Sequence, residues 1–117
     1  MPERIQRRRT KGWRLPDGAV SVTRPSEFGN PFRVSRLNGH PDYDWWVEYS
    51  TTSVWFFKTK VEAADAAVRL YRHWIDLPQN HKLRARARLA LHGKNLACFC
   101  RLEDSCHADV LLSISNE

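Results

Sequence analysis

The sequence predicts a small single-domain α/β sandwich with a short, mostly parallel sheet, an aromatic β-hairpin and about three helices. Its 117 residues suffice for one domain and are too few for two. Apolar residues recur with strand and helix periods in the order strand, hairpin, two helices, strand, helix. The two helices supply the long crossover that parallel strands require. We therefore expect one α/β domain over 15–117, preceded by a flexible basic tail at 1–14.

The first predicted strand is short and runs into a loop. Residues 19–23 alternate between apolar and polar side chains, and Arg24 and Pro25 end the run. Residues 26–32 contain Gly-Asn-Pro-Phe, in which glycine and asparagine tolerate left-handed backbone and the proline disfavours helix at Asn30. We expect these residues to form a loop.

An aromatic segment follows at 43–57. Seven of its residues are aromatic: Tyr43, Trp45, Trp46, Tyr49, Trp55, Phe56 and Phe57. The polar residues 50–53 can reverse the chain, so we expect an antiparallel hairpin.

Helical signals dominate the second half. Thr59 and Glu62 have the spacing of a capping box, and apolar residues recur at helical spacing until Pro78. A second helix is expected over 80–93. A third follows a cap at Asp104 or Ser105.

Between these helices, residues 96–100 (Leu-Ala-Cys-Phe-Cys) form a short apolar run typical of a buried strand. We expect this strand to lie parallel to the strand at 19–23, as its neighbour in the sheet.

Composition and charge narrow the class of protein. Hydrophobic residues make up 42% and charged residues 27%, as in ordinary globular proteins, and no apolar stretch reaches the length of a membrane span. The N-terminus is charged where a signal peptide would be apolar, and the three cysteines are clustered rather than dispersed. We therefore expect a cytoplasmic protein without a membrane partner.

The net charge of +6 is concentrated in two blocks. Residues 1–14 hold six basic side chains and one acid, and residues 81–94 hold five basic side chains and no acid. This distribution suits a polyanion, although solvated charged surfaces are also common. The residues predicted to contact phosphates or bases are Arg7, Arg8, Arg9, Lys11, Trp13, Arg14, Arg84 and Arg88.

A cluster of sulfur and imidazole is the strongest chemical signal. Cys98, Cys100, Cys106 and His107 fall within ten positions. Cys98 and Cys100 share a face of the predicted strand, and Cys106 begins the last helix, where free N–H groups stabilise a thiolate.

Three interpretations of this cluster remain open. All four residues are candidate zinc ligands, because thiolates and imidazole bind zinc tetrahedrally. Alternatively, Cys106 and His107 are candidate catalytic residues, as a thiol nucleophile beside a base. In the third interpretation the cysteines are small buried hydrophobic residues.

Topology predicts a pocket that includes this cluster. In open α/β sheets, ligands bind beyond the carboxyl ends of parallel strands. The loops after 19–23 and 96–100 would then meet at one edge. The predicted ligand-binding residues there are Arg24, Asn30, Phe32 and Cys100, beside Cys106 and His107.

Several blocks resemble an uncharacterised family that is known only as domain of unknown function 4326. They are 10–16, 20–24, 29–32, 93–100 and 106–112, so the resemblance spans nearly the whole chain. Phe28 and Phe99 stand where that family often has tryptophan, which keeps an aromatic ring. The resemblance implies a compact, phage-borne α/β domain and supplies no established activity.

The function that we expect is binding or processing of a nucleotide or nucleic-acid ligand at the Cys/His pocket. Whether the protein is an enzyme is left open. One alternative is a non-catalytic phage protein that binds a host protein through exposed aromatic residues. The other is a zinc-stabilised nucleic-acid-binding module, in which zinc is the cofactor.

Overall fold

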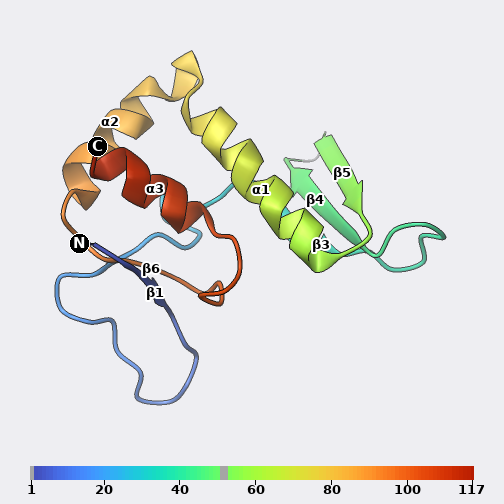
Figure 1. Cartoon of the computed structure of the whole chain (residues 1–117), viewed down its shortest axis with the longest axis horizontal. Coiled ribbons are helices and arrows are strands. Elements are labelled where there is room, and N and C mark those ends of the chain that lie inside the picture. Colours follow the sequence, from blue (N-terminus) through green and yellow to red (C-terminus); the bar gives the residue numbers. More distant parts are fainter. Residues whose placement is uncertain (1, 51–52) are drawn as a thin grey trace.

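Two small sheets lie in different parts of the molecule, and helix α1 spans the distance between them (Figure 1). The computed structural model describes residues 2–50 and 53–117. Within them, three parallel strands have the order β1-β6-β2, and three antiparallel strands have the order β3-β4-β5. Three α-helices complete this part of the chain. The predicted α/β class is confirmed.

The parallel sheet contains the predicted pair of neighbouring strands. β2 (Val20–Ser21) lies parallel to β6 (Leu96–Cys98), with Val20 opposite Leu96. All three residues of β6 are buried, as its apolar sequence predicts. Helices α1 and α2 lie between these strands in the chain and form the crossover.

A third strand, β1 (Arg4–Gln6), pairs with the other edge of β6. It lies inside the segment that the sequence led us to expect as a flexible tail. The buried strand β6 has backbone groups on both edges that need hydrogen-bond partners, and β1 supplies them along one edge. This pairing uses backbone groups, which explains why residues 4–6, with one apolar side chain between two polar ones, do not predict it.

The helices begin and end close to their sequence signals. In α1 (Lys60–Ile75), Thr59 accepts a hydrogen bond from the N–H of Glu62, which confirms Thr59 as the N-cap. A 3₁₀ turn, η1 (Pro78–Asn80), leads into α2 (His81–Leu91).

Helix α3 (His107–Ser115) differs from prediction at its start. Its N-cap is Cys106, and neither Asp104 nor Ser105 caps it. The physical reason is that Ser105 donates its hydroxyl hydrogen to Asp65 on α1 instead.

The antiparallel sheet contains the aromatic hairpin. β4 (Trp45–Tyr49) pairs with β5 (Ser53–Phe57), and residues 51–52 of the predicted turn lie outside the described residues. β3 (Arg33–Arg36), which we did not predict, adds a third strand along β4. Helix α1 packs against all three strands and also against α3.

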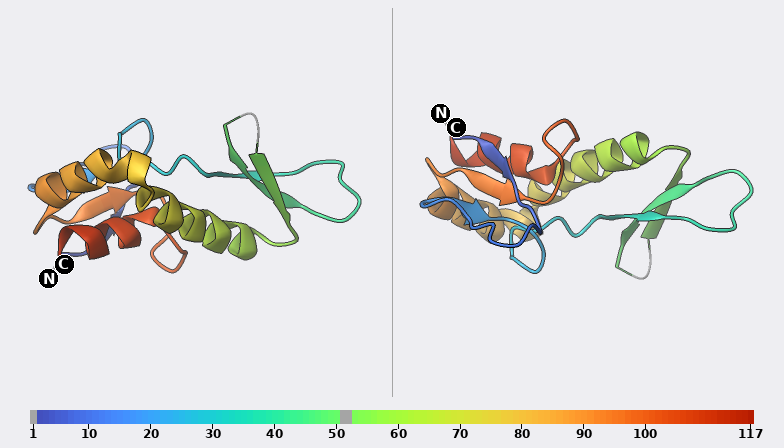
Figure 2. Two further views of the ribbon diagram at one scale, coloured as in Figure 1. Left: turned by 90° about the horizontal axis from the view of Figure 1, so that it is seen from above. Right: turned by 90° about the horizontal axis from the view of Figure 1, so that it is seen from below.

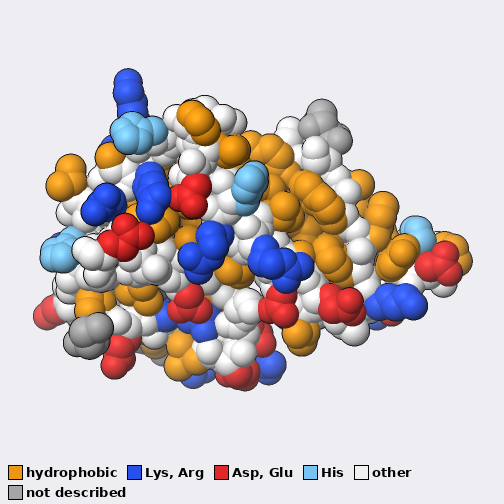
Figure 3. Space-filling model, turned by 45° about the horizontal axis from the view of Figure 1, so that its top comes forward, with side chains coloured by type: hydrophobic (Ala, Val, Ile, Leu, Met, Phe, Trp, Pro, Cys, Tyr) orange, Lys and Arg blue, Asp and Glu red, His pale blue; other side chains and the backbone are white. Residues whose placement is uncertain are grey.

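A hydrophobic core runs through the molecule. The molecule is flat, with extents of 45 × 40 × 21 Å, and the two views of Figure 2 show it edge-on. Its largest fully buried side chains include Tyr71, Ile75, Leu91, Leu96 and Leu111. Hydrophobic side chains also reach the surface around α1 and the hairpin, whereas charged side chains of both signs cover the other half (Figure 3). No helix in 2–50 or 53–117 is long and apolar enough to cross a membrane.

Candidate functional site

A cavity of about 390 Å³ opens where the three parallel strands end. The segment that follows each strand contributes to its wall. Arg9 lies beyond β1, Thr23 and Arg24 lie beyond β2, and Phe99 and Cys100 lie beyond β6. The volume is in the usual range for small-molecule sites, at the sheet edge where such sites form.

The other walls come from the Gly-Asn-Pro-Phe loop, from α1 and from the start of α3. The cavity is lined by all six residues that the sequence assigned to a pocket: Arg24, Asn30, Phe32, Cys100, Cys106 and His107. The parallel pairing of β2 and β6 explains this meeting, because it directs both following loops to the same edge. Their ligand-binding and catalytic roles stay predictions.

The three cysteines form a tight cluster beside this cavity. Their sulfur atoms all lie within 4.8 Å of one another, and the sulfurs of Cys98 and Cys100 are 3.7 Å apart. Cys98 ends β6, Cys100 lies two residues on, and Cys106 caps α3. Cys98 and Cys106 are buried and Cys100 is half-buried, so the cluster is accessible mainly at Cys100.

Contacts among the three thiols shift their pKa values in different directions. Hydrogen bonds from Cys100 and then from Cys106 lower the pKa of Cys98, because they stabilise its thiolate. Hydrogen bonds with Cys106 and then with Cys98, together with burial, raise the pKa of Cys100. Cys100 acts to lower the pKa of Cys106, but Cys98 and burial outweigh it and raise that pKa. A thiolate in this cluster would therefore be stabilised by hydrogen bonds from neighbouring thiols.

His107 is buried between the cysteines and β2. Its Nε2 lies 2.8 Å from the carbonyl oxygen of Val22 and its Nδ1 lies 3.7 Å from the sulfur of Cys106. A carbonyl only accepts, so Nε2 carries the hydrogen and Nδ1 has the lone pair. Burial lowers the pKa of His107 and keeps the ring neutral. Of the four predicted zinc ligands, the structure brings only the three cysteines within mutual ligating distance.

Asn30 shapes the loop that borders the cavity. Its Oδ1 accepts from the N–H of Phe32 at 2.9 Å, and its Nδ2 donates to the carbonyl of Ala67 at 3.3 Å. Its own carbonyl accepts from Nη1 of Arg24 at 2.5 Å. Both ends of the side chain therefore have protein partners, and Asn30 positions Arg24 and Phe32.

Arg4 is a site residue that the sequence did not indicate. Its Nη2 donates to the carbonyls of Leu102 and Asp104, at 2.6 and 2.9 Å, and so holds the loop between Cys100 and Cys106. Burial acts to lower the pKa of Arg4, but the Cys106 thiol and then the Asp109 carboxylate outweigh it and raise that pKa. No sequence pattern signals this role, because it depends on β1 pairing with β6.

The predicted nucleic-acid residues of the N-terminal segment fall into two groups. The guanidinium groups of Arg7 and Arg9 lie over the Phe99 ring, 4.5 and 4.2 Å from its centre, and Arg9 lines the cavity. Arg8, Lys11 and Arg14 are exposed in the long segment after β1, where Trp13 is half-buried.

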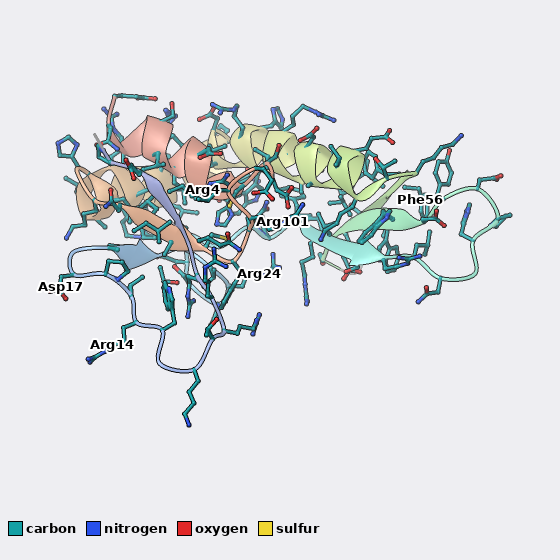
Figure 4. The ribbon with its side chains drawn as sticks, turned by 60° about the horizontal axis from the view of Figure 1, so that its bottom comes forward. Arg4, Arg14, Asp17, Arg24, Phe56 and Arg101 are labelled. Carbon is teal, nitrogen blue, oxygen red and sulfur yellow. The ribbon has the colours of Figure 1, made fainter. Side chains whose placement is uncertain are left out.

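Arg84 and Arg88 lie on α2, outside the cavity lining. Arg84 forms ion pairs with Asp76 and Glu117, so its charge is already partly balanced. Figure 4 shows Arg4, Arg24 and Arg101 around the end of the parallel sheet, and Arg14 on the long loop away from it.

Comparison with known sequences identifies a family that covers nearly the whole chain. The family described as "Domain of unknown function (DUF4326)" matches residues 5–117. No curated protein and no solved structure matches the chain.

Proposed function

We propose that this chain, which belongs to the DUF4326 family, binds a nucleotide unit in the cavity at the carboxyl edge of its parallel sheet. The observation that carries the proposal is the composition of the cavity. Two arginines, an arginine-stacked phenylalanine and the start of α3 surround one concave space. The nucleotide unit is either free or part of a single strand.

The phosphate would be held by positive charge at the rim. Arg9 and Arg24 line the cavity from two different strand ends, whereas Asp104 is its only lining carboxylate among the described residues. The first turn of α3 adds free N–H groups and a partial positive charge. Arg24 is already oriented, since the Asn30 carbonyl accepts from it.

The base would stack beside Phe99. The Arg9 guanidinium lies 4.2 Å from the centre of that ring, and stacked guanidinium planes are surfaces on which unpaired bases pack. Phe32 provides a buried apolar wall on another side. The exposed basic side chains of the segment after β1, Arg8, Lys11 and Arg14, would extend contact to neighbouring phosphates.

Binding of fluorescently labelled single-stranded DNA and RNA to the full reduced chain tests the proposal. We expect Arg9→Gln and Arg24→Gln each to weaken binding about tenfold, since each removes a charge-assisted phosphate contact. Arg88→Gln is the matched control, because it removes the same charge from an exposed position on α2.

The salt dependence of strand binding distinguishes binding in the cavity from general electrostatic attraction to a basic protein. Each cavity variant should reduce the salt slope by about 0.7, the value for one phosphate contact on a single strand. Equal weakening by Arg88→Gln and Arg9→Gln would refute the cavity. Competition by mononucleotides against labelled strands then shows whether a free nucleotide suffices or a strand is required.

A further inference from the structure

We infer that Cys98, Cys100 and Cys106 hold a zinc ion through three thiolates, with the fourth coordination position facing the cavity. The inference rests on the thiol cluster alone and does not require the ligand of the cavity to be a nucleotide. It differs from a four-ligand site in leaving His107 off the metal.

The sulfur positions fit the metal. Zinc binds thiolates at about 2.3 Å, and tetrahedral ligands at that distance lie about 3.8 Å apart. The sulfurs of Cys98 and Cys100 are 3.7 Å apart, and all three sulfurs lie within 4.8 Å of one another. A small contraction toward a central ion would complete the site without moving a secondary-structure element.

The chemistry of the donor set selects zinc over hard cations. Three thiolates form a soft ligand set, which favours zinc over calcium or magnesium. In the described residues no carboxylate belongs to the cluster.

The surroundings suit the charge of such a centre. One Zn²⁺ and three thiolates carry a net charge of −1. Nε of Arg4 lies 3.6 Å from a carboxylate oxygen of Asp109, whereas its Nη1 is buried without a hydrogen-bond partner. A thiolate cluster would give this end of the guanidinium an anionic neighbour as well. Arg24 lines the same cavity as the three cysteines.

The fourth position would be open because His107 Nδ1 lies outside the group of ligand atoms that the three sulfurs form. Nε2 of His107 is engaged by the carbonyl of Val22, and Nδ1 is close to Cys106 but outside the mutual cluster. All three cysteines border the cavity, which can admit a water molecule or a small ligand to the ion. Zinc sites with three protein ligands and one open position are the kind that activate water or bind substrates.

Metal analysis of the full chain, expressed without a metal-binding tag and kept reduced, is the first test. We expect about one zinc ion per chain. Replacement by Co²⁺ should give the sulfur-to-cobalt charge-transfer absorption and the intense visible bands of a tetrahedral site. X-ray absorption should show three sulfur ligands and one lighter ligand.

Zinc binding by single variants distinguishes the residues that ligate the metal from those that only lie near it. Cys100→Ser, at the most accessible thiol, should lower zinc affinity by at least about 100-fold, the upper end of what loss of an outer-shell partner costs. His107→Gln and the exposed neighbour variant Arg101→Gln should keep one zinc per chain. Far-ultraviolet circular dichroism checks that each variant is folded.

Azide added to the Co²⁺ form tests the open position, since a ligand that enters it shifts the visible bands. Substoichiometric metal, a cobalt spectrum without sulfur charge transfer, or loss of zinc in folded His107→Gln would overturn the inference. Unchanged bands at saturating azide would overturn the open fourth position. Loss of strand binding with zinc retained would refute only the nucleotide proposal.

Discussion

His107 and Val22 are joined by a hydrogen bond between Nε2 and the backbone carbonyl, with a distance of 2.8 Å. The two residues are 85 positions apart, and the contact connects the first turn of α3 to the segment that follows β2. It thereby fixes the thiol cluster relative to the loop that carries Arg24.

Replacing His107 should therefore reduce stability. His107→Ala leaves the Val22 carbonyl buried without a donor, so the free energy of unfolding should fall by about 1–3 kcal/mol. His107→Gln keeps an N–H donor and should lose less. Urea unfolding measures both. Exposed His73→Gln on α1 is the control, and equal stability of His107→Ala and the original chain would contradict the role.

Arg4 should be as important as a core residue despite its place near the N-terminus. Arg4→Gln removes the charge and the donors that hold the carbonyls of Leu102 and Asp104. We expect a loss of about 2–4 kcal/mol in urea unfolding, since each hydrogen bond to a charged group contributes about 1.5–3 kcal/mol. Exposed Arg101→Gln should cost less than about 0.5 kcal/mol. A similar loss in both variants would show that Arg4 has no special role.

The variant Asn30→Asp tests whether the hydrogen bond from Asn30 to Ala67 stabilises the loop. In Asn30→Asp the side chain still accepts from the N–H of Phe32, but it places a carboxylate oxygen beside the carbonyl of Ala67. Stability should fall by about 1–3 kcal/mol at neutral pH. Thermal unfolding followed by circular dichroism measures the loss. Unchanged stability would show that the contact with Ala67 carries little energy.

The variant Gly29→Ala tests whether the close approach of the Gly-Asn-Pro-Phe loop to Arg24 matters. A Cβ at residue 29 would lie 3.0 Å from both the backbone nitrogen and Cγ of Arg24. Gly29→Ala should therefore shift Arg24, lower the free energy of unfolding by about 1–3 kcal/mol and weaken strand binding. Parallel unfolding and binding measurements check both effects. Full strand affinity in this variant would show that the position of Arg24 is not required.

Variants of Phe99 test whether its aromatic ring contributes to strand binding. Phe99→Trp keeps an aromatic ring beneath Arg9 and should preserve strand binding, whereas Phe99→Leu should weaken it by about 1–3 kcal/mol. Fluorescence polarisation measures both affinities. Equal binding by the two variants would exclude an aromatic contribution.

Much of the fold could be predicted because its signals are local. The capping box at Thr59 and Glu62 and the stop at Pro78 act over a few residues, and they place α1 accurately. The apolar run of β6 predicts burial, and the two-helix crossover predicts its parallel partner. The cavity follows from that pairing, since both loops leave the same edge.

The features that the sequence did not predict depend on contacts between elements that are distant along the chain. β3 was missed because its sequence, Arg-Val-Ser-Arg, has a single apolar residue, and its strand conformation comes from pairing with β4. Cys106 rather than Ser105 caps α3 because Asp65, 40 positions away, takes the serine hydroxyl. Such contacts depend on where other elements lie.

The sequence by itself therefore determined the helices, the buried strand and the grouping of three cysteines within nine positions. Only the tertiary structure decided that the arginine-rich N-terminus would supply β1 and a buried Arg4, and that His107 would face Val22. Helix caps and apolar periods act between neighbours along the chain. By contrast, the hydrogen bonds that Arg4 and His107 contribute to the site join residues more than 80 positions apart, whose partners exist only once the sheet has formed.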